Sequence, residues 1–268
     1  MTESPTPRLG PVAWAVGALA VGVVAFGAAQ LLENGDDGAA PPTTTAADTR
    51  ANPGPITGPN PAEGPVDYSD LAVRVAPSRR VALRASPGGR VLGFVDDTTE
   101  FGSPETLSPT GEQRGRWIAV RHTSLGNTRV AWIDVDGAGT VFGPRRVRIE
   151  VDLSTRELRV VTRERALRRM QVAVGAPDSP TPPGEYYVTD KLRGADFGEF
   201  YGCCILALSG RQPNLPRGWS GGDRLAIHGS PTPTWGQNVS NGCFHAREAD
   251  LRYLLRTVPL GTVVTVRA

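Results

Sequence analysis

The chain has 268 residues, which is enough for two modest domains. Its 29 basic and 27 acidic residues give a formal net charge of +2, and this near balance argues against a nucleic-acid partner. The 24 prolines and 32 glycines predict much loop and turn, and they argue against a protein built from long helices.

An uncharged apolar segment at residues 11–32 is long enough to cross a bilayer as a helix. Arg8 precedes it and the first charged residues after it are acidic, which predicts a cytoplasmic tail at residues 1–10 and the rest of the chain outside. We expect an uncleaved single-pass membrane anchor, with a cleaved signal peptide as the alternative. Residues 33–64 are rich in Pro, Thr and Gly, and we expect an unfolded linker there.

Short apolar runs separated by turn signals predict a β domain over residues 65–144. Turns are expected where Gly, Pro or Asn cluster, at residues 87–89, 108–111 and 125–127. The runs RASP, GRWI and AWI resemble a bacterial SH3-like barrel. Trp117 and Trp132 are either exposed ligand-binding aromatics or core residues. His122 is expected at the surface.

Residues 145–268 predict a second β-rich domain, which opens with runs that alternate polar and apolar positions as hairpins do. The Gly- and Pro-rich segments 194–201 and 209–223 are expected to be long loops and candidates for a lid over a cleft. Three aromatic residues are candidates for the walls of that cleft, with core packing as the alternative: Tyr201, Trp219 and Trp235.

The three cysteines do not make a disulfide framework, because an odd number leaves at least one thiol free. Cys203 and Cys204 are adjacent, and we expect them on opposite faces of a strand. The alternatives are a disulfide between these neighbours, or a redox pairing of one of them with Cys243.

A histidine and a cysteine flank a Pro-, Thr- and Gly-rich loop near the end of the chain. His228 ends an apolar run, and Cys243 follows a glycine in a turn ahead of a predicted helix over residues 246–255. A cysteine is a useful nucleophile only as its thiolate, which a nearby imidazole or backbone N–H groups favour. The pair is therefore either a nucleophile with its base or a buried thiol and a core histidine that share a chain by chance.

The stretch from residue 146 to residue 268 resembles the L,D-transpeptidase (YkuD-type) catalytic domain. The sequences IHGS and SNGCFHA resemble the two parts of that family's cysteine motif. VAVGAPDSPTPPGEYYVTD, YGCCILALSG and READLRYLLRTVPLGTVVTV resemble its other segments, in the same order. The resemblance implies a β-sandwich with a short helix after the cysteine motif. The expected fold is therefore mainly β, with this sandwich, a small SH3-like barrel and an N-terminal transmembrane helix.

The resemblance implies a peptidoglycan L,D-transpeptidase. Cys243 would attack the carbonyl between the third residue of a stem peptide and its terminal D-alanine, with His228 as general base and then acid. The thioester would pass to the side-chain amine of another stem and form a 3→3 crosslink. Carbapenems are alternative acyl donors for the family. The implied partners are stem peptides and the membrane, with the catalytic domain outside the cell and facing the wall.

The residues around the pair have implied roles too. The resemblance assigns a carbonyl that holds the imidazole to Gly229, the shape of the turn to Ser240, and the oxyanion hole to Asn241, Gly242 and the Cys243 amide. Asn241 stands where the family usually has histidine, and His245 where it usually has arginine or asparagine. His245 is therefore a candidate modulator: as a cation near neutral pH it would make activity fall as pH rises.

Three other functions stay open. Water as the acceptor would make the protein an L,D-carboxypeptidase. A domain whose altered motif no longer turns over would leave a membrane-tethered wall-binding protein. A wall amidase or endopeptidase is less favoured, because those enzymes usually carry zinc-ligand clusters or a different cysteine motif. No metal or other cofactor is expected, since three scattered histidines and one catalytic cysteine make a poor zinc site.

Overall fold

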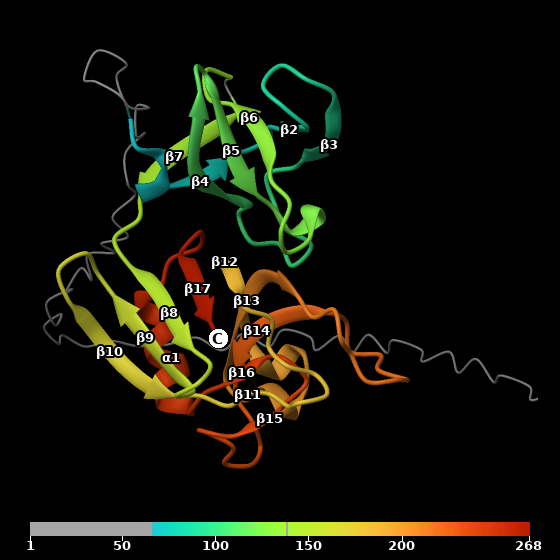
Figure 1. The fold of residues 1–268 in the computed structure, drawn as a ribbon, viewed down its shortest axis with the longest axis vertical. Helices are drawn as coiled ribbons and strands as arrows, with labels where there is room; N and C mark the ends of the chain where they lie inside the picture. Colours follow the sequence, from blue (N-terminus) through green and yellow to red (C-terminus); the bar gives the residue numbers. More distant parts are fainter. Residues whose placement is uncertain (1–65, 138) are drawn as a thin grey trace, which may run out of the picture. The chain divides into compact units, whose positions relative to one another are not determined.

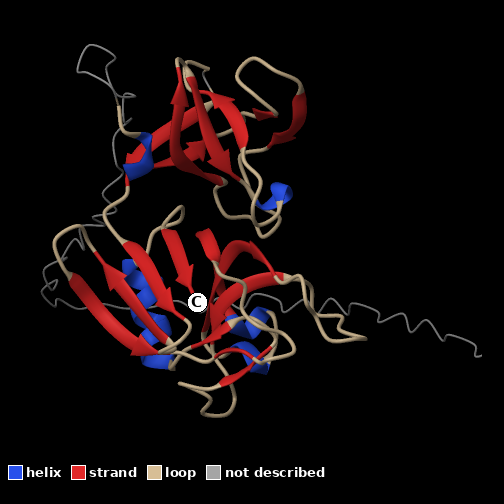
Figure 2. Ribbon diagram, viewed as in Figure 1, coloured by secondary structure: helices blue, strands red, loops and turns tan. Residues whose placement is uncertain are grey.

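The computed structural model describes residues 66–137 and 139–268, which belong to one compact unit. These residues form two main β-sheets and a single α-helix (Figures 1 and 2). The predicted tail, transmembrane helix and linker lie outside the described residues. Within the described ranges, no helix is long and apolar enough to cross a membrane.

Residues 66–144 form the N-terminal β domain, a seven-stranded sheet with the order β3-β2-β6-β5-β4-β1-β7. Its elements are η2 (Tyr68–Asp70), β1 (Leu71–Val75), β2 (Val81–Arg84), β3 (Val91–Val95), β4 (Thr106–Arg114), β5 (Trp117–Arg121), η3 (Thr123–Leu125), β6 (Ala131–Asp134) and β7 (Thr140–Pro144). Apolar side chains such as Val73, Ile118 and Ile133 are fully buried in one hydrophobic cluster. The domain therefore has a core of its own.

One predicted turn of this domain is wrong. Residues 108–111 lie inside β4, where the pairing with β5 is irregular between Pro109 and Gln113. Proline lacks the N–H that a strand ladder needs, and Gly111 has a φ of +92° that favours glycine. These two residues mark a bulge within a long strand instead of its end.

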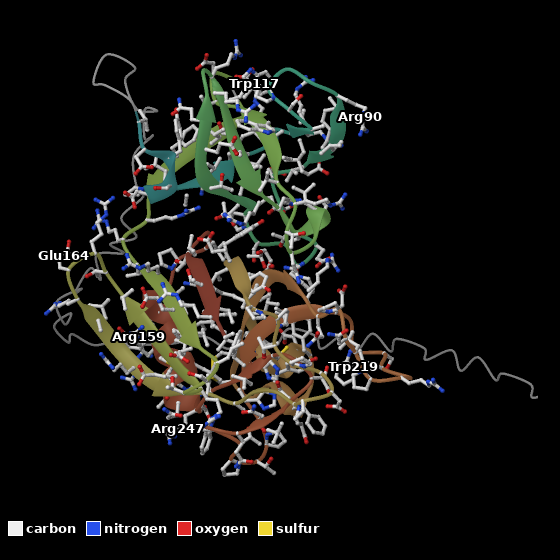
Figure 3. All side chains as sticks on the ribbon, viewed as in Figure 1. Arg90, Trp117, Arg159, Glu164, Trp219 and Arg247 are labelled. Atoms are coloured by element: carbon white, nitrogen blue, oxygen red, sulfur yellow. A yellow bond between two sulfur atoms is a disulfide. The ribbon has the colours of Figure 1, made fainter. Side chains whose placement is uncertain are left out.

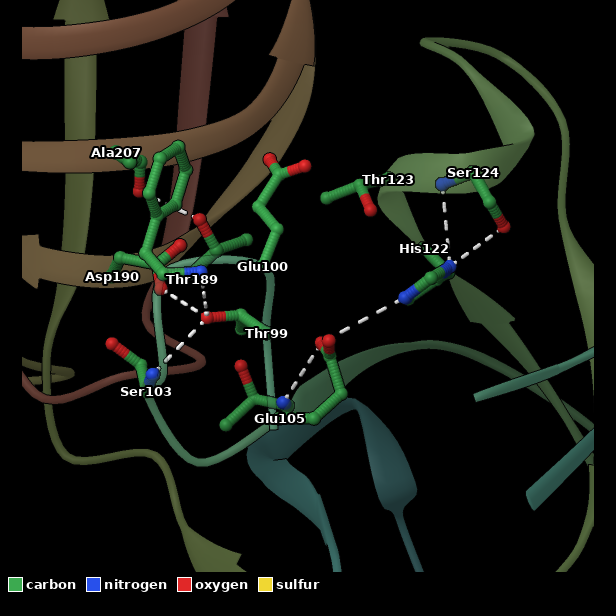
Figure 4. Close-up of polar contacts among 12 residues, drawn as sticks. Thr99, Glu100, Ser103, Glu105, His122, Thr123, Ser124, Thr189, Asp190 and Ala207 are labelled. Carbon is green, nitrogen blue, oxygen red and sulfur yellow. Dashed lines mark hydrogen bonds and ion pairs between the residues drawn. The ribbon is translucent and has the colours of Figure 1, made fainter. Parts of the chain in front are cut away.

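The two tryptophans and the histidine of the domain are packed. Trp132 is buried, Trp117 is half-buried, and the guanidinium groups of Arg114 and Arg84 lie over their rings. The expectation of a surface His122 is wrong: its side chain is 10% exposed and its Nε2 lies 3.7 Å from a carboxylate oxygen of Glu105 (Figure 4). Packing therefore accounts for these rings without a ligand.

Residues 145–268 form the C-terminal β domain, an eight-stranded sheet with the order β10-β9-β8-β17-β12-β13-β14-β16, and a small sheet of β11 and β15. Its elements are β8 (Arg148–Asp152), β9 (Glu157–Val161), β10 (Ala166–Gln171), β11 (Val174–Gly175), β12 (Gly184–Arg193), η4 (Gly194–Asp196), η5 (Glu199–Tyr201), β13 (Cys204–Arg211), β14 (Arg224–His228), β15 (Asn238–Ser240), β16 (Phe244–His245), α1 (Glu248–Thr257) and β17 (Val263–Arg267). The antiparallel run β8-β9-β10 confirms the predicted hairpins.

Helix α1 begins two residues later than predicted and packs its apolar face against the sheet. Leu251 and Leu254 are fully buried in the core with strands β8, β13 and β17. Acidic Glu248 and Asp250 lie in the first turn and Arg256 in the last, which suits the helix dipole. The helix therefore closes the core next to the cysteine motif.

Cys203 and Cys204 are joined by a disulfide. The expectation that they lie on opposite faces of a strand is wrong, because β13 begins only at Cys204 and Cys203 belongs to the preceding turn. Cys243 is the free cysteine of the chain. The bond fixes the turn that leads from η5 into β13.

Asp250 links α1 to the edge strand β10. Its buried carboxylate accepts two hydrogen bonds from Arg168, at 2.9 and 2.6 Å. We expect Asp250→Ala to lower the free energy of unfolding by about 2 kcal/mol, because charge-assisted hydrogen bonds at a buried carboxylate are lost. Urea unfolding measures this. The exposed pair of Glu248 and Arg252 on the same helix is the control, and Glu248→Ala should cost less than about 0.5 kcal/mol. Equal effects of the two substitutions would contradict the assignment.

Candidate active site

The predicted site residues meet at a cavity of about 590 Å³ in the C-terminal β domain. The side chains that line it come from η5, β14, the cysteine turn and the segment between β13 and β14, and Trp219 of that segment is labelled in Figure 3. The predicted residues among its lining are Tyr201, Trp219, His228, Ser240, Asn241, Cys243 and His245. The predicted loop 209–223 begins later than expected, since Ser209 still belongs to β13.

The pairing of two strands brings the histidine and the cysteine together. β14 and β16 run parallel, with Ile227 opposite Phe244 and His228 opposite His245. The amide of Ala246 also donates to the His228 carbonyl at 2.9 Å. Because Cys243 directly precedes β16, this register places it beside Ala226, two residues before His228 on the neighbouring strand, and both side chains line the cavity.

The cysteine turn is held by hydrogen bonds from both sides. Ser240 Oγ donates to the Cys243 carbonyl at 2.6 Å, and Thr181 Oγ1 donates to the Gly242 carbonyl at 2.8 Å. Gly242 has a φ of +110°, and a Cβ there would lie 2.1 Å from Nε2 of Gln212. Only glycine fits this position. Sequence reasoning missed Thr181 and Gln212. Thr181 lies 61 residues before Gly242, and Gln212 lies 29 residues before Asn241, the residues of the turn that they bind.

The turn offers one amide for an oxyanion. The Gly242 N–H donates to Ser240 Oγ at 3.1 Å. The Cys243 N–H has no partner within residues 66–137 and 139–268, so of the Gly242 and Cys243 amides it is the one available to a ligand. Asn241 lines the cavity beside it, and its carbonyl accepts from Gln212 at 3.3 Å.

His228 is buried and held by a main-chain carbonyl. Its Nδ1 lies 2.7 Å from the Gly229 oxygen, and because a carbonyl only accepts, Nδ1 carries the proton and Nε2 is the basic nitrogen. Burial, and then the neighbouring His245, lower the pKa of His228 to about 4, against a smaller opposing effect of the Gly229 carbonyl. The imidazole is therefore neutral at pH 7.

The thiol of Cys243 is protonated in the same environment. Burial raises its pKa to about 11, with a smaller opposing effect of a main-chain hydrogen bond from Ala226. Its Sγ lies 3.8 Å from the main-chain oxygen of Arg224 and donates to it. At pH 7 the site therefore holds a neutral thiol and a neutral imidazole, and no thiolate–imidazolium pair.

His245 is a neutral neighbour of His228. The two rings lie 4.8 Å apart, and His245 Nδ1 is 3.2 Å from the hydroxyl of Thr234. Burial lowers the pKa of His245 below its ordinary value of 6.5. Burial therefore disfavours the cation that was expected near neutral pH, whereas the expected fall of activity with rising pH stays a prediction.

The three predicted wall aromatics differ in position. The Tyr201 ring lies 4.9 Å from the His228 ring, and Trp219 is 45% exposed at the cavity and donates to the Gly222 carbonyl. Trp235 does not line the cavity; the Arg247 guanidinium lies 4.9 Å from its ring. Phe200, which sequence reasoning missed, lines the cavity and is 74% exposed.

Arg224 is the cation of the cavity lining, and its guanidinium is already bound by other groups of the protein. Its guanidinium binds the Leu208 carbonyl at 3.0 Å, Thr189 at 2.8 Å and Glu100 at 2.6 Å. The described part of the chain holds no group of three or more His, Cys, Asp or Glu side chains arranged to bind a metal ion.

The fold and the site define a mainly β protein with a cysteine and a histidine at one cavity. The L,D-transpeptidase catalytic domain family, YkuD, matches residues 146–266. Two Bacillus proteins named for this family are similar to the chain. YkuD of Bacillus licheniformis is 31% identical over 122 residues, which are 44% of this chain and 64% of that protein. YqjB of Bacillus subtilis is 30% identical over 126 residues, which are 43% of this chain and 68% of that protein.

The chain belongs to the YkuD family of L,D-transpeptidase catalytic domains. It spans just under two thirds of the YkuD relatives, at 64% of their length. L,D-transpeptidase 3 of Mycobacterium tuberculosis, crystallised with a faropenem-derived adduct, is 19% identical with a TM-score of 0.36, over 52% of this chain and 73% of that one. The assignment rests on the sequence matches.

The protonation state of the thiol is testable by alkylation. With the pKa of Cys243 near 11, its reaction with iodoacetamide should rise about tenfold per pH unit through pH 7–10 and level off only near pH 11. Intact mass against time measures the rate, and Cys243→Ala is the control for other sites. A plateau already between pH 5 and 7 would show a preformed thiolate–imidazolium pair and contradict the assignment.

His245 should act on the pKa of His228. We expect His245→Asn to raise the pKa of His228 from about 4 toward 6.5, because a second titratable ring beside the first is removed. NMR titration of the imidazole signals measures it. His122→Asn, a substitution in the N-terminal β domain, should leave the value unchanged. An unchanged pKa in His245→Asn would mean that burial alone sets the value.

Proposed function

We propose that the protein is a cysteine-dependent peptidoglycan L,D-transpeptidase that forms 3→3 crosslinks. The observation that carries the proposal is the opening of Cys243 and His228 onto one cavity, through the parallel pairing of β14 with β16, in a chain of the YkuD family. The substrate and the acceptor amine are those that the family resemblance implies. The protonation states and contacts of Cys243 and His228 support the steps of the reaction.

Acylation begins with a neutral thiol and a neutral imidazole. Cys243 Sγ attacks the carbonyl carbon that joins the third stem residue to D-alanine, while Nε2 of His228 takes the thiol proton as general base. The proton moves as the attack proceeds, since the imidazole is too weakly basic to ionise the resting thiol. The Gly229 carbonyl binds Nδ1–H and stabilises the imidazolium that forms.

The tetrahedral intermediate then collapses to a thioester. The Cys243 amide donates to the oxyanion, and His228 returns its proton to the amine of D-alanine, which leaves. A side-chain amine of a second stem attacks the thioester and gives its proton to His228. The new amide forms as the C–S bond breaks, and the proton goes back to Sγ, so the enzyme is regenerated.

A specific observation favours a second candidate, a catalytically impaired wall-binding protein. Ser240 occupies the Gly242 amide, so the oxyanion has one main-chain donor where two were expected. Removing one such donor typically slows an enzyme by about 10²–10³-fold. An acceptor water in place of the amine would give the related L,D-carboxypeptidase.

The setting of the enzyme is proposed from sequence. The apolar segment 11–32 would anchor the protein in the cell membrane, the linker 33–64 would extend outward, and the catalytic domain at residues 145–268 would face the cell wall. The N-terminal β domain, residues 65–144 by the sequence limits, would be an SH3-like module beside it. These limits and the SH3-like assignment rest on sequence pattern.

The test of the function is product analysis with a disaccharide-tetrapeptide. We expect release of D-alanine and a dimer whose tandem mass spectrum shows a bond between the two third residues. Cys243→Ala and His228→Ala should slow this by at least about 10³-fold, because each removes a group that makes or breaks bonds. His122→Asn is the matched histidine control and should keep the wild-type rate.

Three outcomes separate the candidates. A 3→3 dimer supports the transpeptidase. D-alanine release without a dimer, also dependent on Cys243, supports the carboxypeptidase. Binding of the tetrapeptide without any product, in folded protein, supports the impaired wall-binding protein and contradicts the proposal.

A further inference from the structure

One loop of the N-terminal β domain touches the framework of the active site. The loop between β3 and β4 is closed on itself: the Thr99 amide donates to the Ser103 carbonyl at 2.8 Å, and Thr99 Oγ1 accepts from the Phe101 and Ser103 amides. A closed loop presents its side chains in fixed directions. Thr99, Glu100 and Phe101 each contact the C-terminal β domain or a side chain of its cavity.

Thr99 fixes the loop to strand β12. Its hydroxyl donates to Oδ1 of Asp190 at 2.5 Å, and Asp190 is fully buried (Figure 4). The other carboxylate oxygen lies 3.9 Å from the guanidinium of Arg224. A buried carboxylate needs such partners, since an unpaired buried charge is costly. The contact is therefore a built junction between the two sheets.

Glu100 leads to the cysteine. Its carboxylate pairs with Nη1 of Arg224 at 2.6 Å, and the rest of that guanidinium is bound to Leu208 and Thr189. Arg224 is the first residue of β14, and its own carbonyl accepts the thiol of Cys243. The bound Arg224 side chain thus fixes the position of the Arg224 main-chain oxygen, to which the Cys243 thiol donates.

Phe101 is connected to His228 through a series of aromatic ring contacts. Its ring centroid lies 5.8 Å from that of Phe197, which lies 6.2 Å from that of Tyr201. Both contacts are edge-to-face, the arrangement that aromatic pairs favour. Tyr201 then lies 4.9 Å from the His228 ring, and its carbonyl accepts the Gly229 amide at 2.8 Å.

We propose that Glu100 and Phe101 are positioning residues of the active site, so that the N-terminal β domain is a part of the catalytic unit and not only a separate binding module. Two adjacent residues reach the two reacting side chains by independent routes, one through Arg224 and one through Tyr201. The inference rests on the proposed function where it is tested by the rate of acyl transfer. Where it is tested by the pKa values of Cys243 and His228, it needs only these two residues.

The test compares loop variants with matched controls in the full chain. Glu100→Ala and Phe101→Leu should each slow acyl transfer about tenfold in kcat with little change in KM, because small displacements of reacting groups reduce rate strongly. Phe101→Tyr keeps the ring contact and should restore the rate. Glu112→Ala and Phe94→Leu are exposed positions of the same domain, and they should keep the wild-type rate.

A residue that only stabilised the fold would lower the melting temperature without moving the pKa of either reacting group. If Glu100 holds the Arg224 carbonyl in place, Glu100→Ala should let water reach the thiol and bring the alkylation midpoint of Cys243 below about 11. If Phe101 holds Tyr201 against the imidazole, Phe101→Leu should let water reach that ring and raise the NMR pKa of His228 above about 4. Glu100 is 59% exposed in its side chain, so its variants, including the near-isosteric Glu100→Gln, leave no buried cavity.

The outcomes are distinct from those of the proposed function. If Glu100 and Phe101 variants match their controls in both titrations, the inference is overturned, whatever the activity. If wild-type protein forms no product but the titrations shift as expected, the proposed function fails and the positioning role stands. Should Phe101→Leu unfold, as melting temperature would show, the Glu100 variants decide.

Discussion

The parallel pairing of β14 with β16 is the constraint on which the site depends. β14 is an inner strand between β13 and β16, and its last residue, His228, pairs with His245, two residues after Cys243. A parallel pair requires a crossover connection, and residues 229–243 supply it. The chain leaves β14, pairs briefly as β15 with β11, and returns through Gly242, where a side chain would collide with Gln212. Ile227 and Phe244, which pair in this register, are also fully buried in the domain core, so the core and the site share this constraint.

Burial then decides the chemistry of the pair. The same walls that order Cys243 and His228 remove water from both, which raises the pKa of the thiol and lowers that of the imidazole. The site thus holds a neutral acid, the Cys243 thiol, and a neutral base, the His228 imidazole. The proton moves between them only when a bound substrate makes the transfer favourable. Such a thiol resists adventitious alkylation. His245 adds a neutral ring where a cation was expected.

The sequence predicts the local parts of this arrangement and misses the distant ones. Cys243, His228 and the following helix could be predicted, because the motif is contiguous and its glycine marks the turn. The prediction of a turn at residues 108–111 was wrong, because Pro109 and Gly111 indicate a β-bulge as strongly as they indicate a turn. The junctions of Thr99 with Asp190 and of Glu100 with Arg224 join residues 91 and 124 positions apart. No periodicity in one chain encodes such pairs.

The central claim is that Cys243 becomes acylated with His228 as its base. The most direct measurement is the intact mass of the protein after incubation with a carbapenem. The account predicts one covalent adduct per chain, absent in Cys243→Ala, formed at a rate that does not fall as pH rises above about 5, because His228 is already neutral there. Folded protein that stays unmodified, or an adduct that survives Cys243→Ala, would contradict it.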